Sequence, residues 1–286
     1  MQNTPNPSES NPQSLKTNWT NLTIVTVFHT LAFAALYYFN WQNLIAMLIL
    51  NWLVASLGVG IGYHRLLTHR GFKTPKWLEY VLTALGSLAI QDGAIKWVAT
   101  HRIHHAHTET ERDPHSPRES GYWAHLGWII RGTAQGHDEA TLARYVPDLL
   151  KDPVHVLMAR YYSVFTILLG VILFAVGGWT MVLWGVFLRT VFGWHSTWIV
   201  NSITHLWGTR RFPTRDDSTN NGLVALFSFG EGWHNNHHAH PTSARHGLAW
   251  YEFDMNWLTI RLFEKLGWAK QIRTTVLPKE TAQEAG

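Results

Sequence analysis

The stretch LIAMLILNWLVASLGVGIGY, residues 44–63, is almost entirely apolar and about as long as a helix that crosses a bilayer. A second apolar stretch, residues 22–39, precedes it, and only the sequence NWQN separates the two. A similar pair follows much later in the chain and is joined by the sequence GGWT. We therefore predict an all-α membrane protein with four transmembrane helices in two hairpins, at about residues 22–39, 44–63, 158–176 and 181–203.

The distribution of basic residues predicts the orientation of these helices. The two short loops contain no Lys or Arg, and nearly all basic residues lie in the N-terminal tail, in residues 64–160 and after residue 204. The positive-inside rule then places both long segments and both termini in the cytoplasm, in a bacterial inner or thylakoid membrane. Residues 64–157 and 204–275 would form a helical cap. A soluble bundle with buried helices is the alternative, but it rarely produces two paired spans with uncharged loops.

The rest of the sequence predicts one domain between two polar tails. Residues 1–20 are polar and rich in Asn, Pro and Ser, which is typical of disorder, and no signal peptide is evident there. Residues 276–286 form a second polar tail, which leaves 21–275 as a single domain. The shorter apolar segment 77–90 predicts an interfacial or buried helix of the cap. The net charge of +4 is modest, and no basic run is interleaved with stacking aromatics, so we do not expect nucleic-acid binding.

Histidines gather in three clusters next to the predicted spans. The sequence HRLLTH places His64 and His69 at the end of the second span. The other two clusters share the spacing i, i+3, i+4, which puts three imidazoles on one face of a helix; their members are His101, His104, His105, His234, His237 and His238. A lone histidine is often structural, but three such clusters on one side of a membrane predict a metal site.

The donor set narrows the choice of metal. The chain has no cysteine, which excludes disulfides, zinc–thiolate sites and iron–sulfur clusters. Imidazole ligands suit iron, copper or zinc. Eight imidazoles exceed what one ion accepts, so two ions are implied, whereas catalytic zinc normally has three protein ligands and a water. A two-iron centre can use O₂ to attack an unactivated C–H bond, and a site at a membrane surface suits a long acyl chain.

Three motifs identify a family resemblance. The sequences GYHRLLTHR (62–70), HRIHHAHTETERDPHSP (101–117) and GEGWHNNHHAHP (230–241) resemble the membrane Δ9 fatty acyl desaturases, and the resemblance covers residues 22–270. It implies four transmembrane helices under a cytoplasmic cap that holds two iron ions (Fe²⁺). The implied ligands are the eight clustered histidines with His205, from NSITHLWG, and Asn201 through a water. The spacing of the histidines alone would not identify His205 as a ligand. Beyond this metal centre we expect no further catalytic or cofactor-binding residue.

Several neighbouring residues receive supporting roles or none. Glu109, Asp113 and Glu231 are candidate acceptors for the second ring nitrogen of a ligand histidine. The resemblance gives His107 and His240 no ligand role, and no chemistry is assigned to His115. Trp97 and Trp198 are candidates to line an acyl tunnel, although core packing explains them equally well. We interpret the polar residues inside the spans as structural, with no role in the reaction: His29, Arg189 and His195.

The resemblance implies O₂-dependent formation of a cis double bond at the Δ9 position of a saturated C16 or C18 acyl chain. Animal acyl-CoA desaturases carry Asn and Arg where this chain has Asp92 and Ala99, and an Arg-Lys pair where it has Gly132 and Thr133. An anionic CoA would lack cationic partners here. The chain is therefore more similar to the bacterial and cyanobacterial acyl-lipid (stearoyl-lipid) 9-desaturases, which act on membrane glycerolipids.

The electrons are expected from a separate protein. The chain has neither the HPGG of an attached cytochrome b5 domain nor a dinucleotide-binding fingerprint outside its membrane spans, and ferredoxin fits the acyl-lipid type. A basic stretch of the cap could dock this donor, although such a stretch is more often solvated: Arg210, Arg211 and Arg215. Three alternatives stay open, namely the same reaction on acyl-CoA or acyl carrier protein, a di-iron hydroxylase, and a metal transporter. GEGWHNNHH disfavours the hydroxylase, and ligands outside the spans disfavour transport.

Overall fold

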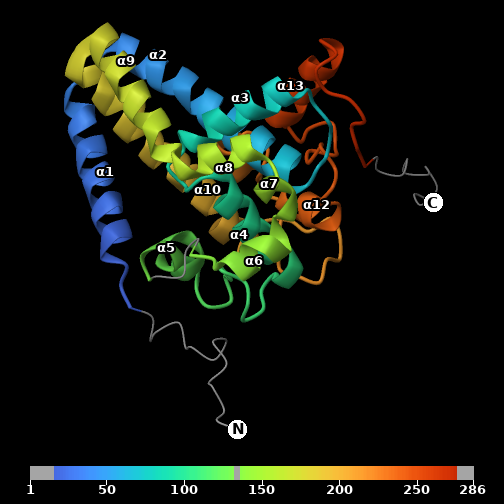
Figure 1. Cartoon of the computed structure of the whole chain (residues 1–286). Helices are drawn as coiled ribbons and strands as arrows, with labels where there is room; N and C mark the ends of the chain where they lie inside the picture. The colour runs from blue at the N-terminus through green and yellow to red at the C-terminus, as the bar shows by residue number, and fades with distance from the viewer. Residues whose placement is uncertain (1–15, 132–135, 276–286) are drawn as a thin grey trace.

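A computed structural model describes residues 16–131 and 136–275, and the regular structure of these residues is helical, with only isolated β-bridges (Figure 1). The helices are α1 Trp19–Tyr37, α2 Trp41–Asn51, η3 Trp52–Thr68, α3 Lys76–Ser87, α4 Ala94–His107, η4 Trp123–Gly127, α5 Trp128–Ile130, α6 Glu139–Tyr145, α7 Pro147–Leu150, α8 Pro153–Arg160, α9 Tyr162–Val182, η5 Leu183–Leu188, α10 Arg189–Ser202, η6 Ile203–His205, α11 Gly222–Phe227, α12 His234–Ala239 and α13 Met255–Lys265. Helices η3, η4 and η5 are π-helical, and η6 is a 3₁₀ turn. Helix α1 begins inside the predicted tail 1–20, and the predicted tail 276–286 lies outside the described residues.

Three apolar helical runs are long enough to cross a membrane: Trp19–Tyr37, Trp41–Thr68 and Tyr162–His205. They indicate an integral membrane protein. The second run is longer than predicted because α2 continues into η3 without a break. The start predicted near residue 158 falls inside the separate helix α8, which ends at Arg160, and α9 begins at Tyr162.

The third run reverses its direction at Gly178, whose φ of 66° and ψ of −161° interrupt the helix. This backbone conformation is readily adopted only by glycine. The segments on either side pack against each other: a side-chain carbon on Gly185 would meet Leu173, and one on Gly170 would meet Val186. These pairings are those of two antiparallel arms. The predicted loop GGWT is therefore a single non-helical residue within an otherwise helical reversal.

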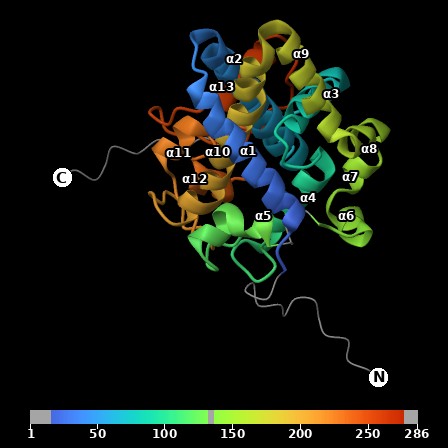
Figure 2. The same ribbon diagram turned by 90° about the vertical axis from the view of Figure 1, so that its left-hand side faces the viewer.

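The polar residues of the first and fourth predicted spans are bonded to one another. Helix α1 lies over α10 (Figure 2), and His29 Nε2 is 3.1 Å from His195 Nε2. His195 Nδ1 is in turn 3.0 Å from His125 Nε2, and His125 Nδ1 is 3.1 Å from the Ser202 hydroxyl. The interpretation of His29 and His195 as satisfied structural residues is consistent with this chain of contacts.

The shorter helices gather at one end of the long ones and form the cap (Figure 1). The largest buried apolar cluster lies where η3 meets α3, α4 and α13, and it includes Ile61, Leu82, Val98 and Ile260. The predicted cap helix at residues 77–90 is α3, and its buried face carries Leu78, Leu82 and Gly86. This core fixes the C-terminal end of η3, where the first histidine cluster begins.

Helix α3 crosses η3 at two glycines, where the backbones touch. A Cβ on Gly58 would lie 2.4 Å from the backbone nitrogen of Gly86, so no other residue fits there without displacing the helix. We expect Gly58→Val to lower the free energy of unfolding by about 1–3 kcal/mol or more, through overpacking. Thermal unfolding of the purified protein in detergent would measure this loss. Gly170→Ala is the matched control, since its Cβ has 3.9 Å to the nearest atom; an equal loss in both variants would contradict the prediction.

Candidate metal centre

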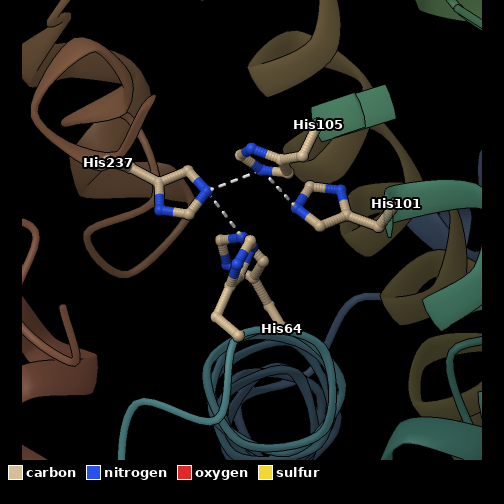
Figure 3. Close-up of side chains that lie close together, drawn as sticks. His64, His101, His105 and His237 are labelled. Atoms are coloured by element: carbon tan, nitrogen blue, oxygen red, sulfur yellow. Dashed lines mark hydrogen bonds between the residues drawn. The ribbon is translucent and has the colours of Figure 1, made fainter. Parts of the chain in front are cut away.

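Nine histidines of the cap form two adjacent groups, whose ring nitrogens lie within 4.8 Å of one another in each group. We call the first group site A, which comprises His64, His69, His101, His105 and His237. We call the second group site B, which comprises His104, His205, His234 and His238. Figure 3 shows four rings of site A pointing toward one another, His64 from η3, His101 and His105 from α4, and His237 from α12. Every histidine that was predicted as a ligand therefore belongs to one of the two groups.

Helices α4 and α12 each contribute to both sites. In α4, His101 and His105 face site A, while His104 faces site B. In α12 the assignment is reversed, with His234 and His238 in site B and His237 in site A. The i, i+4 pair of one helix thus lies opposite the single histidine of the other, because the two helices present their histidine faces to each other. The sites share these two helices and lie side by side.

Two asparagines fix the short helix α12 between its histidines. Asn235 accepts hydrogen bonds from the backbone N–H groups of Arg211 and Phe212, at 2.8 and 2.7 Å. Asn236 donates to the Glu252 carboxylate and to the His246 carbonyl, at 3.0 and 2.9 Å. A helix of six residues has little stability of its own. In HNNHH the two asparagines therefore anchor one side of α12 to the surrounding loops, and the histidines lie on the other side.

The ring nitrogens of site A are better arranged to bind a cation than to form hydrogen bonds with one another. His237 Nε2 lies 3.2 Å from His64 Nε2 and 3.0 Å from His105 Nε2, and the latter is 3.1 Å from His101 Nε2. A neutral imidazole nitrogen either donates one hydrogen or accepts. Of these three contacts at most two can be hydrogen bonds, because the nitrogens of His237 and His105 each face two partners but carry only one hydrogen or one lone pair. Converging lone pairs fit a bound metal ion, and imidazole is a donor that transition metals favour.

Buried carboxylates orient four of the rings. Each accepts a hydrogen bond from the Nδ1–H of a histidine, which leaves the lone pair on Nε2 directed into the site. The pairs are Glu231 with His64 at 2.6 Å, Asp113 with His104 at 3.0 Å, Glu109 with His205 at 2.9 Å, and Asp216 with His238 at 3.0 Å. Three of these carboxylates were expected from the sequence. Asp216 was missed, because it lies in a loop whose spacing to the histidines carries no signal.

His246 was also missed by sequence analysis. Its ring centroid is 4.5 Å from that of His237, with the two rings tilted by 36°, and its Nδ1 is 3.3 Å from the Glu231 carboxylate. Two histidines that the resemblance left out, His107 and His240, belong to neither site: His107 contacts the Tyr145 hydroxyl at 3.1 Å, and His240 packs edge-on against Phe212. His115 packs 4.4 Å from His104 and approaches Asp113.

Burial sets the protonation of both sites. It lowers the pKa of five histidines well below that of a free imidazole, and neighbouring histidines lower it further; these are His69, His101, His105, His234 and His237. Burial alone would raise the pKa of Glu231, but neighbouring groups, the Arg65 guanidinium foremost, together outweigh this effect and lower the pKa well below its usual range. Neutral rings beside ionised carboxylates are the state in which imidazoles bind a metal ion.

Arg65 supplies the positive charge that balances the carboxylates next to site A. Its side chain is fully buried and forms ion pairs of 2.9 Å with both Glu231 and Asp254. Asp254 also accepts the backbone N–H groups of His246 and Gly247, which fixes the segment that follows α12. The orientation of His64 therefore depends on a continuous buried network from Asp254 through Arg65 to Glu231.

Two cavities end against the histidine sites. The larger, of about 130 Å³, is lined by Trp97, Trp198 and His101 among others. The second, of about 60 Å³ and mostly apolar, is lined by His64, His101 and His234. Asn201 lines both cavities, beside histidines of both sites. Apolar ligands favour cavities of this kind, with a few polar groups at one end.

The residues considered for the acyl carrier and the electron donor belong to neither histidine site. Asp92 lines the larger cavity and pairs with Lys96 at 3.6 Å, and burial raises its pKa. Ala99 is fully buried, while Gly132 and Thr133 lie outside the described residues. Of the three arginines proposed for docking, Arg210 and Arg215 are exposed, whereas Arg211 forms an ion pair of 2.8 Å with Glu252.

Comparison with known proteins gives a consistent result. A family model described as fatty acid desaturase matches residues 39–269. The chain is 43% identical to the sn-2 palmitoyl-lipid 9-desaturase of Nostoc sp. (strain 36), over 93% of each chain. It is 45% identical to the sn-1 stearoyl-lipid 9-desaturase of Anabaena variabilis, over 90% of this chain and 94% of the relative. It is also 40% identical to the icosanoyl-CoA 5-desaturase of Limnanthes douglasii, over 96% of this chain and 75% of the relative.

Proposed function

Since this chain belongs to the fatty acid desaturase family, we propose that it is an acyl-lipid Δ9 desaturase, an oxidoreductase that introduces a cis double bond into a saturated C16 or C18 chain of a membrane glycerolipid. The observation that carries the proposal is the pair of histidine sites at the end of a mostly apolar cavity, in a protein with membrane-length helices. The position of the double bond rests on the two 9-desaturases named above.

Two iron ions are the proposed cofactor. Site A would hold one and site B the other, and Asn201 would contact one of them through a water. When bound, the irons would supply the O₂-dependent removal of two hydrogens, with two external electrons and two protons consumed and two waters released. Nine imidazole nitrogen donors with no thiolate fit such a pair.

The residues of the chain orient this centre and the substrate. Glu109, Asp113, Asp216 and Glu231 hold four rings in position through their Nδ1–H groups, so the Nε2 atoms need no rearrangement on metal binding. The acyl chain would lie in the larger cavity, lined by Trp97 and Trp198, and in the smaller, mostly apolar cavity, which Trp97 also lines. The desaturated bond would then face the two sites where the cavities meet at Asn201 and His101.

The proposed topology has four membrane crossings, because the run Tyr162–His205 reverses at Gly178. Residues 21–275 would form one domain, with both termini and the metal centre on the cytoplasmic side of a bacterial inner or thylakoid membrane. The absence of Lys and Arg from the two short loops supports this orientation.

Glycerolipid is the favoured acyl carrier. Near the larger cavity, Asp92 is already paired with Lys96 and Ala99 offers no charge, so these positions supply no free cation for the phosphates of CoA. Acyl-CoA or acyl carrier protein is the second candidate, and the similarity to a relative named icosanoyl-CoA 5-desaturase supports acyl-CoA. Ferredoxin is the proposed electron donor, with O₂ as the oxidant. Arg210 and Arg215 are exposed and would attract an acidic donor surface.

Lipid analysis of a desaturase-negative host tests the proposed function. The chain would be expressed with a ferredoxin system after the glycerolipids had been labelled and acyl-CoA synthesis blocked. We expect a new cis Δ9 bond in those pre-formed glycerolipids. Unsaturated chains that appear only when acyl-CoA is supplied would refute the carrier, and hydroxylated chains without a double bond would refute desaturation. His237→Ala serves as the inactive control.

A further inference from the structure

The turn between α3 and α4 has a strained backbone. Ile90 has a φ of 53° and Asp92 a φ of 66°, in the left-handed region that side chains other than glycine seldom adopt. A β-branched residue such as isoleucine is especially unfavourable there. Ile90, Gln91 and Asp92 all line the 130 Å³ cavity, which His101 also lines. Strain of this kind persists only where the surroundings hold the backbone in place, and it gathers at functional sites.

Side chains of helix α10 hold this turn. Arg189 Nη1 donates to the Leu88 carbonyl at 3.0 Å. Trp194 Nε1 donates to the Ala89 carbonyl at 2.9 Å and is 3.3 Å from that of Ile90. Farther along the helix, Thr197 Oγ1 accepts a hydrogen bond of 3.1 Å from Gln91. Three side chains of one helix thus restrain four consecutive residues, 88–91.

Arg189 is the unusual member of this set. It is 1% exposed in a run of membrane-spanning length, and among the described residues it has no carboxylate partner. Its two hydrogen bonds go to carbonyls, that of Gly185 in its own turn of helix and that of Leu88 at the C-terminus of α3. The C-terminal end of a helix carries partial negative charge, which favours a cation. A buried charge within a membrane span is costly and usually functional.

Gln91 connects the turn to the reacting part of the cavity. It accepts a hydrogen bond of 3.0 Å from Trp97 Nε1, and the Trp97 ring stacks 5.2 Å from that of His101 in site A. A displacement of the turn would therefore move the cavity wall relative to the metal centre. The carbons of the acyl chain that face the two sites would change with it.

We propose that Arg189 is a positioning residue for desaturation: by binding the Leu88 carbonyl it holds the strained turn 88–92 against α10, and this turn sets the register of the acyl chain at the metal centre. This inference rests on the proposed desaturase function. It assigns no catalytic contact to Arg189, which acts only through the turn.

The test is the distribution of double-bond positions in the products of the full chain, expressed in the desaturase-negative host. Arg189→Gln removes the cation, and we expect ~tenfold more product with the bond at neighbouring carbons, since a small misplacement of the reacting group has a large effect. Arg189→Lys retains a charged donor and should restore the single isomer. Thr190→Val is the matched control, since Thr190 is equally buried, is next in the helix and has no hydrogen-bond partner for its hydroxyl.

The isomer ratio separates positioning from mere stability, because a poorly folded enzyme yields less product but not a different one. If Arg189→Gln accumulates in the membrane and still yields one isomer, the proposal is overturned. If it does not accumulate, Thr197→Val decides: it removes the bond of 3.1 Å between α10 and Gln91 of the turn, so the variant should accumulate and yield a mixture, and a single isomer would overturn the proposal. A wild-type chain that forms no double bond would refute the desaturase function itself, and this inference with it.

Discussion

Desaturation is expected to fall by more than about 100-fold when His237 is replaced by alanine, since loss of a residue that only orients a metal ligand already costs about 10–100-fold. His237 Nε2 contacts the ring nitrogens of both His64 and His105, at 3.2 and 3.0 Å, and therefore lies at the centre of site A. No other side chain of α12 faces this site. Alanine would leave the remaining rings without a donor from that helix.

The measurement combines product formation with metal analysis. Unsaturated lipid would be measured together with iron per chain in the purified protein, and we expect the variant to lose iron from one site. His240→Ala is the control, because His240 lies three residues further along, just after the last residue of α12, and its ring contacts Phe212 rather than either site. Wild-type activity in the His237 variant would refute the proposal that site A holds a metal ion needed for the reaction.

Arg65→Met is expected to lower the free energy of unfolding by about 3–5 kcal/mol, the usual result of removing one partner from a buried ion pair. Methionine has a similar length but leaves the carboxylates of Glu231 and Asp254 buried without their cation. Because Glu231 also binds His64, the loss should disturb site A and reduce iron content as well.

Thermal unfolding in detergent would measure this loss against a matched control. Arg261→Met breaks an ion pair with Glu264 on the exposed side of α13, where such pairs contribute only about 0–1 kcal/mol. A large difference between the two variants supports the buried network. Equal melting temperatures would mean that Arg65 contributes no more than a solvated pair.

The sequence predicts the ligands better than their arrangement. The spacing i, i+3, i+4 places three rings on one face of α4 and of α12, but the division between the sites depends on how these helices cross. His205 was found only by family resemblance, because a single histidine at the end of a span has no periodic signal. Asp216 and His246 reach the site from loops, whose paths are set by tertiary contacts such as those of Asn235 and Asn236.

The sequence likewise indicates where the apolar runs lie but not how their helices are built. Hydropathy locates the apolar runs, yet it does not reveal that α2 continues into a π-helix to Thr68. Apolar character ends at the lipid boundary, whereas helical hydrogen bonding continues wherever the cap supplies packing, as α3 does against η3 through Gly58 and Gly86. The sequence also does not show that the third run reverses at one residue. A single positive φ, at Gly178, is enough to turn the chain.

The distribution of the ligands along the chain has a consequence for biosynthesis. Both sites draw on α4 and on α12, so neither is complete until the ribosome has passed residue 238. At ~5–20 residues per second, roughly 6–26 s separate the emergence of His105 from that of His234. During this interval the nascent protein exposes imidazoles without their partners, and copper binds such donors more tightly than Fe²⁺ does. Correct metal loading would therefore depend on the supply of metal ions in the cell while the second hairpin is still being inserted.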